Sequence, residues 1–135
     1  MIGSFPQPTL TRQLNGAWSI QQHVGHLADL DTLHEGRLDD FLSGKDVLRP
    51  ADMSNKKTED ANHNSRLMPF ILHEFRQRRM NFVARLEALD ERRIALTAIH
   101  PRLNQPMRLV DMVFFTAEHD DHHLARISRF ASSGQ

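Results

Sequence analysis

The strongest constraint on the fold is a stretch near the end of the chain that is amphipathic at helical spacing and carries His119 and His123. Side chains four residues apart project from the same face of a helix, with Cβ atoms roughly 6 Å apart. Both histidines fall within the apolar stripe, so they point into the protein. A buried imidazole needs hydrogen bonds or a metal ion. The pattern therefore predicts a helix over residues 108–130 with a candidate metal site on its inner face.

Two further stretches, residues 18–42 and 58–89, have the apolar period of long amphipathic helices. Asn15 and Ser19 are alternative N-caps for the first of them. In the second, Pro69 is expected to kink the helix or to start a new segment.

Between these helices, residues 43–57 and 90–106 show no period and contain proline, which is typical of connections, the second with room for a short turn of helix. No segment alternates as a half-buried strand does. The sequence therefore predicts an all-α fold, an up-down bundle of three long helices.

The length of 135 residues predicts a single domain, residues 1–135, with an irregular N-terminal arm over residues 1–16 and a polar tail over residues 131–135. Charge is balanced at 17 basic and 17 acidic residues, so no nucleic-acid partner is expected. No apolar run reaches the roughly 20 residues of a membrane span, and no signal-peptide pattern is present. A cytoplasmic protein is expected.

A metal site on His119 and His123 needs at least one more ligand, and residues 18–42 offer two candidates, His23 and His26. Position alone does not choose between them. Two histidines from one helix and one from a facing helix would leave an open coordination position, as in catalytic zinc sites. Imidazole ligands also suit nickel, iron and copper. Because the chain has nine histidines, a coincidental pair held by hydrogen bonds is the alternative.

Two segments resemble the DinB-like superfamily, whose members are metal-binding helical bundles and include thiol-dependent transferases. The first is Trp18-Ser19-Ile20 followed by His26-Leu27-Ala28-Asp29, and the second, residues 111–127, is similar to the family's closing His-x-x-x-His helix. Residues 62–64 and 75–79 also read like the family, so the resemblance covers about residues 16–130.

The resemblance implies His26, His119 and His123 as ligands of one divalent metal per chain, with zinc expected first and nickel or iron as alternatives. His122 is then expected at the rim of the site. Four acidic residues could orient a ligating imidazole, and three of the four are expected to be merely solvated. The four are Asp29, Glu118, Asp120 and Asp121.

For function, the resemblance implies a metal-dependent enzyme that activates water or a small-molecule thiol, by hydrolysis or by S-transfer. The chain has no cysteine, so a nucleophilic thiol would come from a cosubstrate. Glu118 is the nearest candidate general base by sequence, although it projects about 100° away from His119. The alternative function is a non-catalytic metal-binding or stress-associated interaction module.

The resemblance implies a bundle of four helices, the first of which precedes the Trp18–Ile20 segment, and this chain is expected to lack that helix. Three amphipathic helices would leave an apolar groove open to water. A homodimer in which a second copy covers the groove is therefore expected.

Two further residues have alternative interpretations. Arg79 falls on an apolar stripe and is expected to form a buried ion pair, with Asp31 as one candidate partner; the alternative is an anion-binding residue beside the metal. Trp18 at a helix start is expected to be a packing anchor rather than a substrate platform.

Overall fold

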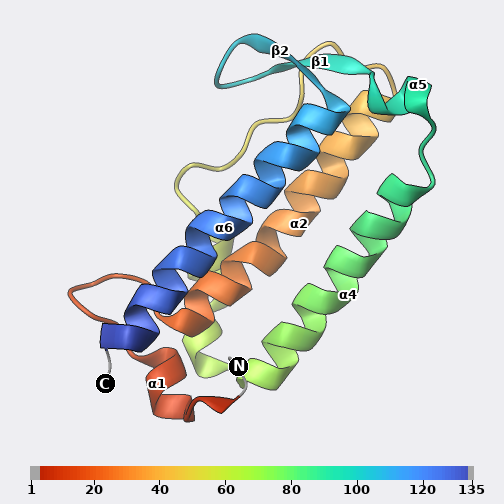
Figure 1. The fold of residues 1–135 in the computed structure, drawn as a ribbon. Helices are drawn as coiled ribbons and strands as arrows, with labels where there is room; N and C mark the ends of the chain where they lie inside the picture. Colours follow the sequence, from red (N-terminus) through yellow and green to blue (C-terminus); the bar gives the residue numbers. More distant parts are fainter. Residues whose placement is uncertain (1–3, 134–135) are drawn as a thin grey trace.

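Three long helices form most of the molecule: α2 (Ile20–Leu42), α4 (Met68–Glu87) and α6 (Leu109–Ser133). The computed structural model describes residues 4–133, so the ends of the expected arm and tail, residues 1–3 and 134–135, lie outside the described residues. α2 lies between α4 and α6 and contacts both (Figure 1). The predicted all-α class with three long helices is confirmed. None of the described helices is long and apolar enough to cross a membrane.

The start of α2 is set by a capping box. The Ser19 hydroxyl accepts the backbone N–H of Gln22 at 3.1 Å, and the Gln22 side chain accepts the N–H of Ser19 at 2.9 Å. These bonds satisfy two backbone donors that the first turn of a helix leaves unpaired. Of the two predicted caps, the structure therefore uses Ser19, and the helix begins at Ile20.

The stretch predicted as one helix over residues 58–89 is divided into three pieces: α3 (Lys56–Ala61), the 3-10 turn η2 (His63–Ser65) and α4. Asn62 separates the first two pieces, with a φ of 51°, a left-handed conformation that ends a helix. Pro69 lies in the first turn of α4, where no intrahelical N–H bond is needed. The predicted new segment at Pro69 is confirmed, whereas the break at Asn62 was not predicted.

A β-hairpin that the sequence did not predict lies at one end of the molecule. β1 (Thr97–His100) and β2 (Gln105–Arg108) pair in antiparallel register, with Ile99 opposite Pro106. Each strand has four residues, too few for an alternating pattern to be recognised, and a proline within a strand argues against one. Before the hairpin, α5 (Glu91–Ile94) is the short turn of helix that the connection was expected to allow.

The N-terminal arm is not irregular throughout, because it contains α1 (Gln7–Thr11). Leu10 of α1 is buried and anchors the arm to one of two hydrophobic clusters. The first cluster lies near α1 and comprises Leu10, Ile20, Val24, Met68, Ile71 and Ile127. The second lies near the hairpin and comprises Leu38, Phe41, Leu48, Phe82, Ala98, Leu109 and Met112.

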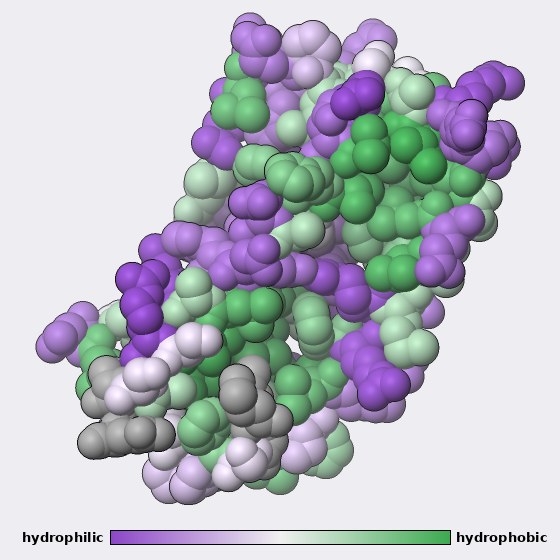
Figure 2. Space-filling model, in the orientation of Figure 1, coloured by the Kyte–Doolittle hydropathy of each residue, from purple (hydrophilic) through white to green (hydrophobic). Residues whose placement is uncertain are grey.

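A polar layer separates these two clusters, and Figure 2 shows hydrophilic residues crossing the middle of the molecule between two hydrophobic regions. Along each long helix, the residues of the two clusters lie on either side of Asp31, Arg79 and Asp120. Arg79 of α4 pairs with Asp31 of α2 and with Asp120 of α6, with 3.0 Å between Arg79 Nη2 and Asp31 Oδ1. The predicted ion pair with Asp31 is confirmed; Asp31 is buried, whereas Arg79 is half-buried. It ties the three long helices together at the level of the candidate metal site.

Candidate metal centre

Three imidazoles from two helices converge on one point. α2 provides His26, α6 provides His119 and His123, and one ring nitrogen of each lies within 4.8 Å of those of the other two. The Nε2 atoms of His119 and His123 are 3.2 Å apart. Two nitrogens that bind a tetrahedral zinc ion at 2.0–2.1 Å are themselves about 3.3 Å apart. The separation of these two histidines therefore fits a shared metal ion.

His23 lies behind His123 and orients it. The two Nδ1 atoms are 2.8 Å apart, so one ring donates a hydrogen bond to the other. With the proton on Nδ1 of His123, its Nε2 carries the lone pair that a metal ligand needs. From the residues alone, either His23 or His26 could be the third metal ligand. The structure places His26 in the group of three and His23 next to it.

His26 is oriented by a chain of two hydrogen bonds. Its Nδ1 lies 3.0 Å from the Thr58 hydroxyl of α3, and that hydroxyl donates to Asp29 Oδ2 at 3.1 Å. Because the single hydroxyl proton goes to Asp29, Thr58 accepts from the N–H at Nδ1 of His26. The Nε2 atom of His26 is therefore the unprotonated one. Among the acidic residues considered from the sequence, Asp29 is the one connected to a ring of the centre in this way.

Asp29 also binds His63 of η2, with 2.8 Å between Oδ2 and Nε2. Burial alone would raise the pKa of Asp29, but hydrogen bonds from His63 and Thr58 outweigh it and lower that pKa, so the group is a carboxylate. The His63 ring packs directly on Gly25, where a Cβ would lie 2.4 Å from the ring. Neither Thr58 nor His63 was given a role from the sequence; the one signal was the resemblance over residues 62–64.

The three rings are held neutral. Burial lowers the pKa of His26 to about 4 and that of His123 to about 3, and it also lowers the pKa of His119. Neighbouring imidazoles lower the pKa of His26 and His123 further, because a proton on one ring disfavours a proton on the next. Metal ions bind the unprotonated imidazole. The group is therefore in its metal-binding form at neutral pH.

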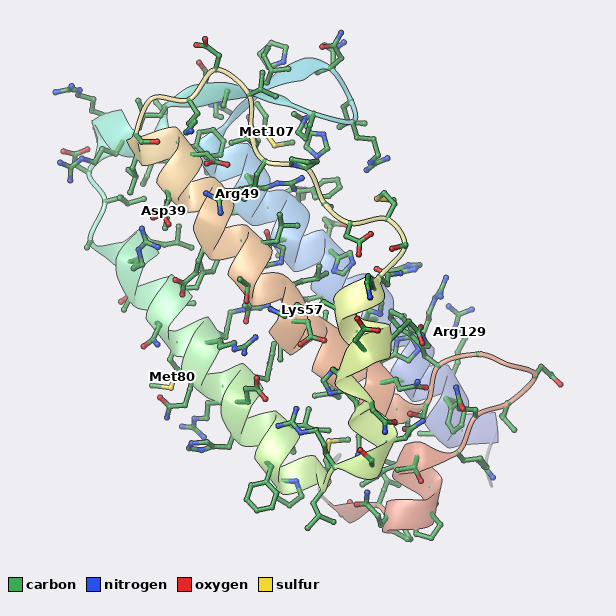
Figure 3. The ribbon with its side chains drawn as sticks, turned by 180° about the vertical axis from the view of Figure 1, so that it is seen from behind. Asp39, Arg49, Lys57, Met80, Met107 and Arg129 are labelled. Carbon is green, nitrogen blue, oxygen red and sulfur yellow. The ribbon has the colours of Figure 1, made fainter. Side chains whose placement is uncertain are left out.

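The three histidines open into a cleft of about 1350 Å³. Its lining comes from α2 and α6, from residues 50–53 and from residues 100–102 of the hairpin. Figure 3 shows the connection after α2, which carries Arg49, and α3, which carries Lys57, passing in front of α2 and α6. The centre thus faces open space on one side, which leaves room for a water molecule or a substrate atom.

Trp18 forms part of the cleft wall beside the histidines. Its ring centroid lies 4.7 Å from that of His26 and 6.2 Å from that of His123, on which it stacks. Its Nε1 donates to Glu59 of α3 at 2.9 Å, which fixes the ring. The indole packs on the histidine rings, as an anchor would, and is also accessible from the cleft.

The other residues considered from the sequence lie around the centre. His122 is exposed, lines the cleft and turns its ring edge-on to His123. Asp120 is engaged by Arg79. Within residues 4–133, Glu118 and Asp121 are exposed and do not line the cleft. The geometry gives no support to Glu118 as a general base, and that role stays a prediction.

Comparisons with known proteins agree with this architecture. The solved structure of YfiT from Bacillus subtilis, described as a probable metal-dependent hydrolase with an unusual four-helix bundle topology, matches with a TM-score of 0.82 and 20% identity. The match covers 98% of this chain and 76% of that chain. No curated protein matches the sequence. The family model of the DinB superfamily matches residues 2–127, and the chain therefore belongs to the DinB superfamily.

Proposed function

We propose that this protein is a metal-dependent hydrolase whose divalent metal is held by His26, His119 and His123. The observation that carries the proposal is the convergence of three neutral imidazoles on the wall of a large cleft. Three-histidine sites with an open position are typical of catalytic zinc. YfiT, which shares the fold, is described as a probable metal-dependent hydrolase, and this supports the same class of reaction.

A divalent metal bound there would act as a Lewis acid and lower the pKa of a water molecule toward 7. The chain's own residues hold and orient the site. Thr58 and Asp29 leave Nε2 of His26 unprotonated, and His23 orients His123. Trp18 packs on one side of the rings, while the cleft provides space for the substrate.

The size of the cleft supports a second candidate, S-transfer from a small-molecule thiol. Sites for a single small ligand are typically about 300–1,000 Å³, and the cleft of about 1350 Å³ exceeds that range. It could hold a low-molecular-weight thiol beside a second substrate. A metal would stabilise the thiolate form of such a thiol.

A non-catalytic metal-binding module would be expected to close its metal shell with a fourth protein ligand. The centre instead opens to the cleft, which favours an enzyme. The alternative module therefore has less support than either reaction.

Metal content is the first test. Mass spectrometry of untagged protein is expected to find about one metal ion per chain, zinc first and nickel or iron as alternatives. The His119→Ala/His123→Ala double variant is expected to lose it. His122→Ala is the matched control, because His122 is exposed beside the same rings, and it should retain the metal. No metal above background after supply of zinc, nickel and iron would refute the proposal.

Activity then separates the two reactions. The metal-loaded protein is screened on a panel of esters, amides and phosphoesters, with and without added low-molecular-weight thiols. Turnover without thiol supports the hydrolase, whereas turnover that requires thiol supports S-transfer. Activity retained by the double histidine variant would contradict both.

A further inference from the structure

The cleft contains a buried arginine that forms no direct ion pair with a carboxylate of the described residues. Arg37 of α2 is 6% exposed and lines the cleft. Its Nε donates to the backbone carbonyl of Arg49 at 3.0 Å, and within residues 4–133 no carboxylate forms an ion pair with its guanidinium group. A buried charge that is not paired directly with an opposite charge is unfavourable. The guanidinium therefore has unused capacity to bind an anion from the cleft.

The nearby carboxylates are already engaged by other groups. Both oxygens of Asp40 bind the guanidinium of Arg49, at 3.0 and 3.1 Å. Asp52 of the cleft wall accepts the backbone N–H groups of Ser54 and Lys56, each at 2.9 Å. The charge of Asp40 raises the pKa of Arg37, but burial outweighs this effect, and neither acid forms a hydrogen bond with the Arg37 guanidinium.

Two further groups at this end of the cleft are hydrogen-bond donors. Arg102 of the hairpin lines the cleft. Burial lowers the pKa of Arg37, Asp40 raises it, and the charge of Arg102 adds a smaller lowering effect. His100 is 3% exposed, and its Nδ1 accepts the backbone N–H groups of Arg102 and Leu103 at 3.2 and 3.1 Å. The ring proton is therefore on Nε2, which makes His100 a donor as well.

Arg37 and the metal centre are connected by one face of α2. His26 and Arg37 are eleven residues apart, which is about three turns and about 16 Å along the helix. His34 lies between them on the same cleft wall, and burial lowers its pKa to about 3, so it is neutral. A ligand that extends along this wall would meet the three histidines at one end and two arginines at the other.

We propose that Arg37 and Arg102, with His100, form an oxyanion-binding subsite for a carboxylate or phosphate group of an elongated substrate whose reacting bond lies at the three histidines. The planar guanidinium group pairs with both kinds of oxyanion through two parallel hydrogen bonds. That the anion belongs to the substrate rests on the proposed function. The anion site itself depends only on the free protein.

The test is anion binding to the metal-free protein, with inorganic phosphate and succinate as separate probes. Isothermal titration calorimetry measures the affinity of every variant, and nuclear magnetic resonance follows the Nε–H signal of Arg37 in the proteins that retain this residue. A saturable shift of that signal is expected, and the stronger probe identifies the preferred oxyanion. Arg102→Gln is expected to weaken binding about tenfold, because a charge-assisted bond is lost. Arg37→Lys keeps the charge but lacks the planar fork, and should weaken it similarly.

Arg92→Gln is the matched control, because Arg92 is an exposed arginine of α5 that does not line the cleft. The affinity of this variant for phosphate and succinate should be unchanged. Equal affinity in Arg102→Gln, Arg37→Lys and the unmodified protein would overturn the proposal, as would the absence of saturable binding of either probe. Because the titration uses metal-free protein, a failure to bind either anion leaves the hydrolase proposal intact. Conversely, loss of metal from the double histidine variant leaves the anion-site proposal intact.

Turnover provides a second readout once a hydrolysed compound is known. Arg102→Gln is expected to raise KM about tenfold for a substrate with a terminal carboxylate, with kcat nearly unchanged. The methyl ester of the same compound should show no such increase. An equal change for both compounds would contradict an anion-specific role.

Discussion

Two of the three imidazoles at the candidate metal centre are oriented by a partner on the far side of the ring. His123 contacts His23, and His26 contacts Thr58, which in turn donates to Asp29. Such contacts commonly decide which nitrogen of a ligand carries the proton. The smallest group in this arrangement, one hydroxyl, therefore determines whether His26 can bind a metal through Nε2.

Replacing Thr58 with valine tests this directly. Valine keeps the shape but removes the hydroxyl. The N–H of His26 then has no acceptor, and Asp29 loses one of its hydrogen-bond donors. We expect metal affinity to fall about 10- to 100-fold and the metal-free protein to lose about 1–3 kcal/mol of stability. Calorimetric zinc titration and urea unfolding measure the two effects. Thr58→Ser retains the hydroxyl and should stay close to the unmodified protein; a valine variant with normal affinity would rule out the orienting role.

The buried histidines predict how stability depends on pH. Burial, with smaller contributions from Arg79, His119, Arg37 and His26, lowers the pKa of His34 to about 3 in the folded protein, against about 6.5 in an unfolded chain. Above pH 6.5 the ring is neutral in both states and has no effect. As pH falls below 6.5, the unfolded chain gains a proton that the folded protein does not, so the free energy of unfolding decreases.

His34→Gln isolates this contribution, because the other histidines titrate in both proteins. Between pH 6 and 4, the unmodified protein should lose up to about 1.4 kcal/mol more per pH unit than the variant. Urea unfolding of the metal-free proteins at several pH values measures both slopes. Parallel slopes would show that His34 is not held neutral in the fold.

At the scale of elements, the packing of η2 on α2 depends on a glycine. Alanine usually stabilises a helix by about 1 kcal/mol relative to glycine, but a Cβ at Gly25 would lie 2.4 Å from the His63 ring. That ring is buried and bonded to Asp29, so it cannot move away freely. Gly25→Ala is expected to reduce stability by about 1–3 kcal/mol despite the better helix former.

Gly36→Ala is the matched control within the same helix. A Cβ there would lie 2.3 Å from Nη1 of Arg49, the end of a flexible side chain that is 49% exposed. Because this group can shift at the expense of a partly exposed ion pair, the loss should be below about 1 kcal/mol. Thermal unfolding compares the two variants. Equal stability changes would mean that the His63 contact does not restrict the packing of η2 on α2.

The elements that could be predicted are those whose pattern repeats over many residues. The three long helices each show an apolar stripe over some twenty residues, whereas a four-residue strand offers too few positions for a period to be recognised. The hairpin also depends on contact with a distant segment, since Val47 pairs with Ile99. Such pairing is set by tertiary packing, which local sequence does not reveal.

The same distinction applies to the site. The pairing of His119 with His123 follows from their spacing on one helix. That His26 faces them depends on how α2 packs against α6, and it was the family resemblance that pointed to this residue. Thr58 and His63 come from a third segment, whose path over α2 depends on the left-handed turn at Asn62.

At the scale of the whole molecule, α6 has apolar side chains on two sides. One side faces the cleft and α2, while Val110, Phe114 and Leu124 lie on the side opposite His119, within about 80° of one another. These three residues are 40%, 67% and 47% exposed. On the face that displays α6, α2 and α4 in Figure 1, Figure 2 shows hydrophobic residues in two regions, with hydrophilic residues between them. Large apolar side chains with this much exposure on one side of a helix are candidates for contact with another surface.

The homodimer expected from the sequence stays a prediction, and we propose that this face of α6 is its interface. Sedimentation velocity of the metal-loaded protein should give a species of twice the chain mass of 15.6 kDa at micromolar concentration. Phe114→Asp places a charge at the most exposed of these three side chains and should shift the protein to the monomer. Leu103→Asp, at an exposed leucine of the hairpin turn, introduces the same charge elsewhere and should leave the dimer intact. A monomer at all concentrations would refute the dimer, and dissociation by both variants would place the interface elsewhere.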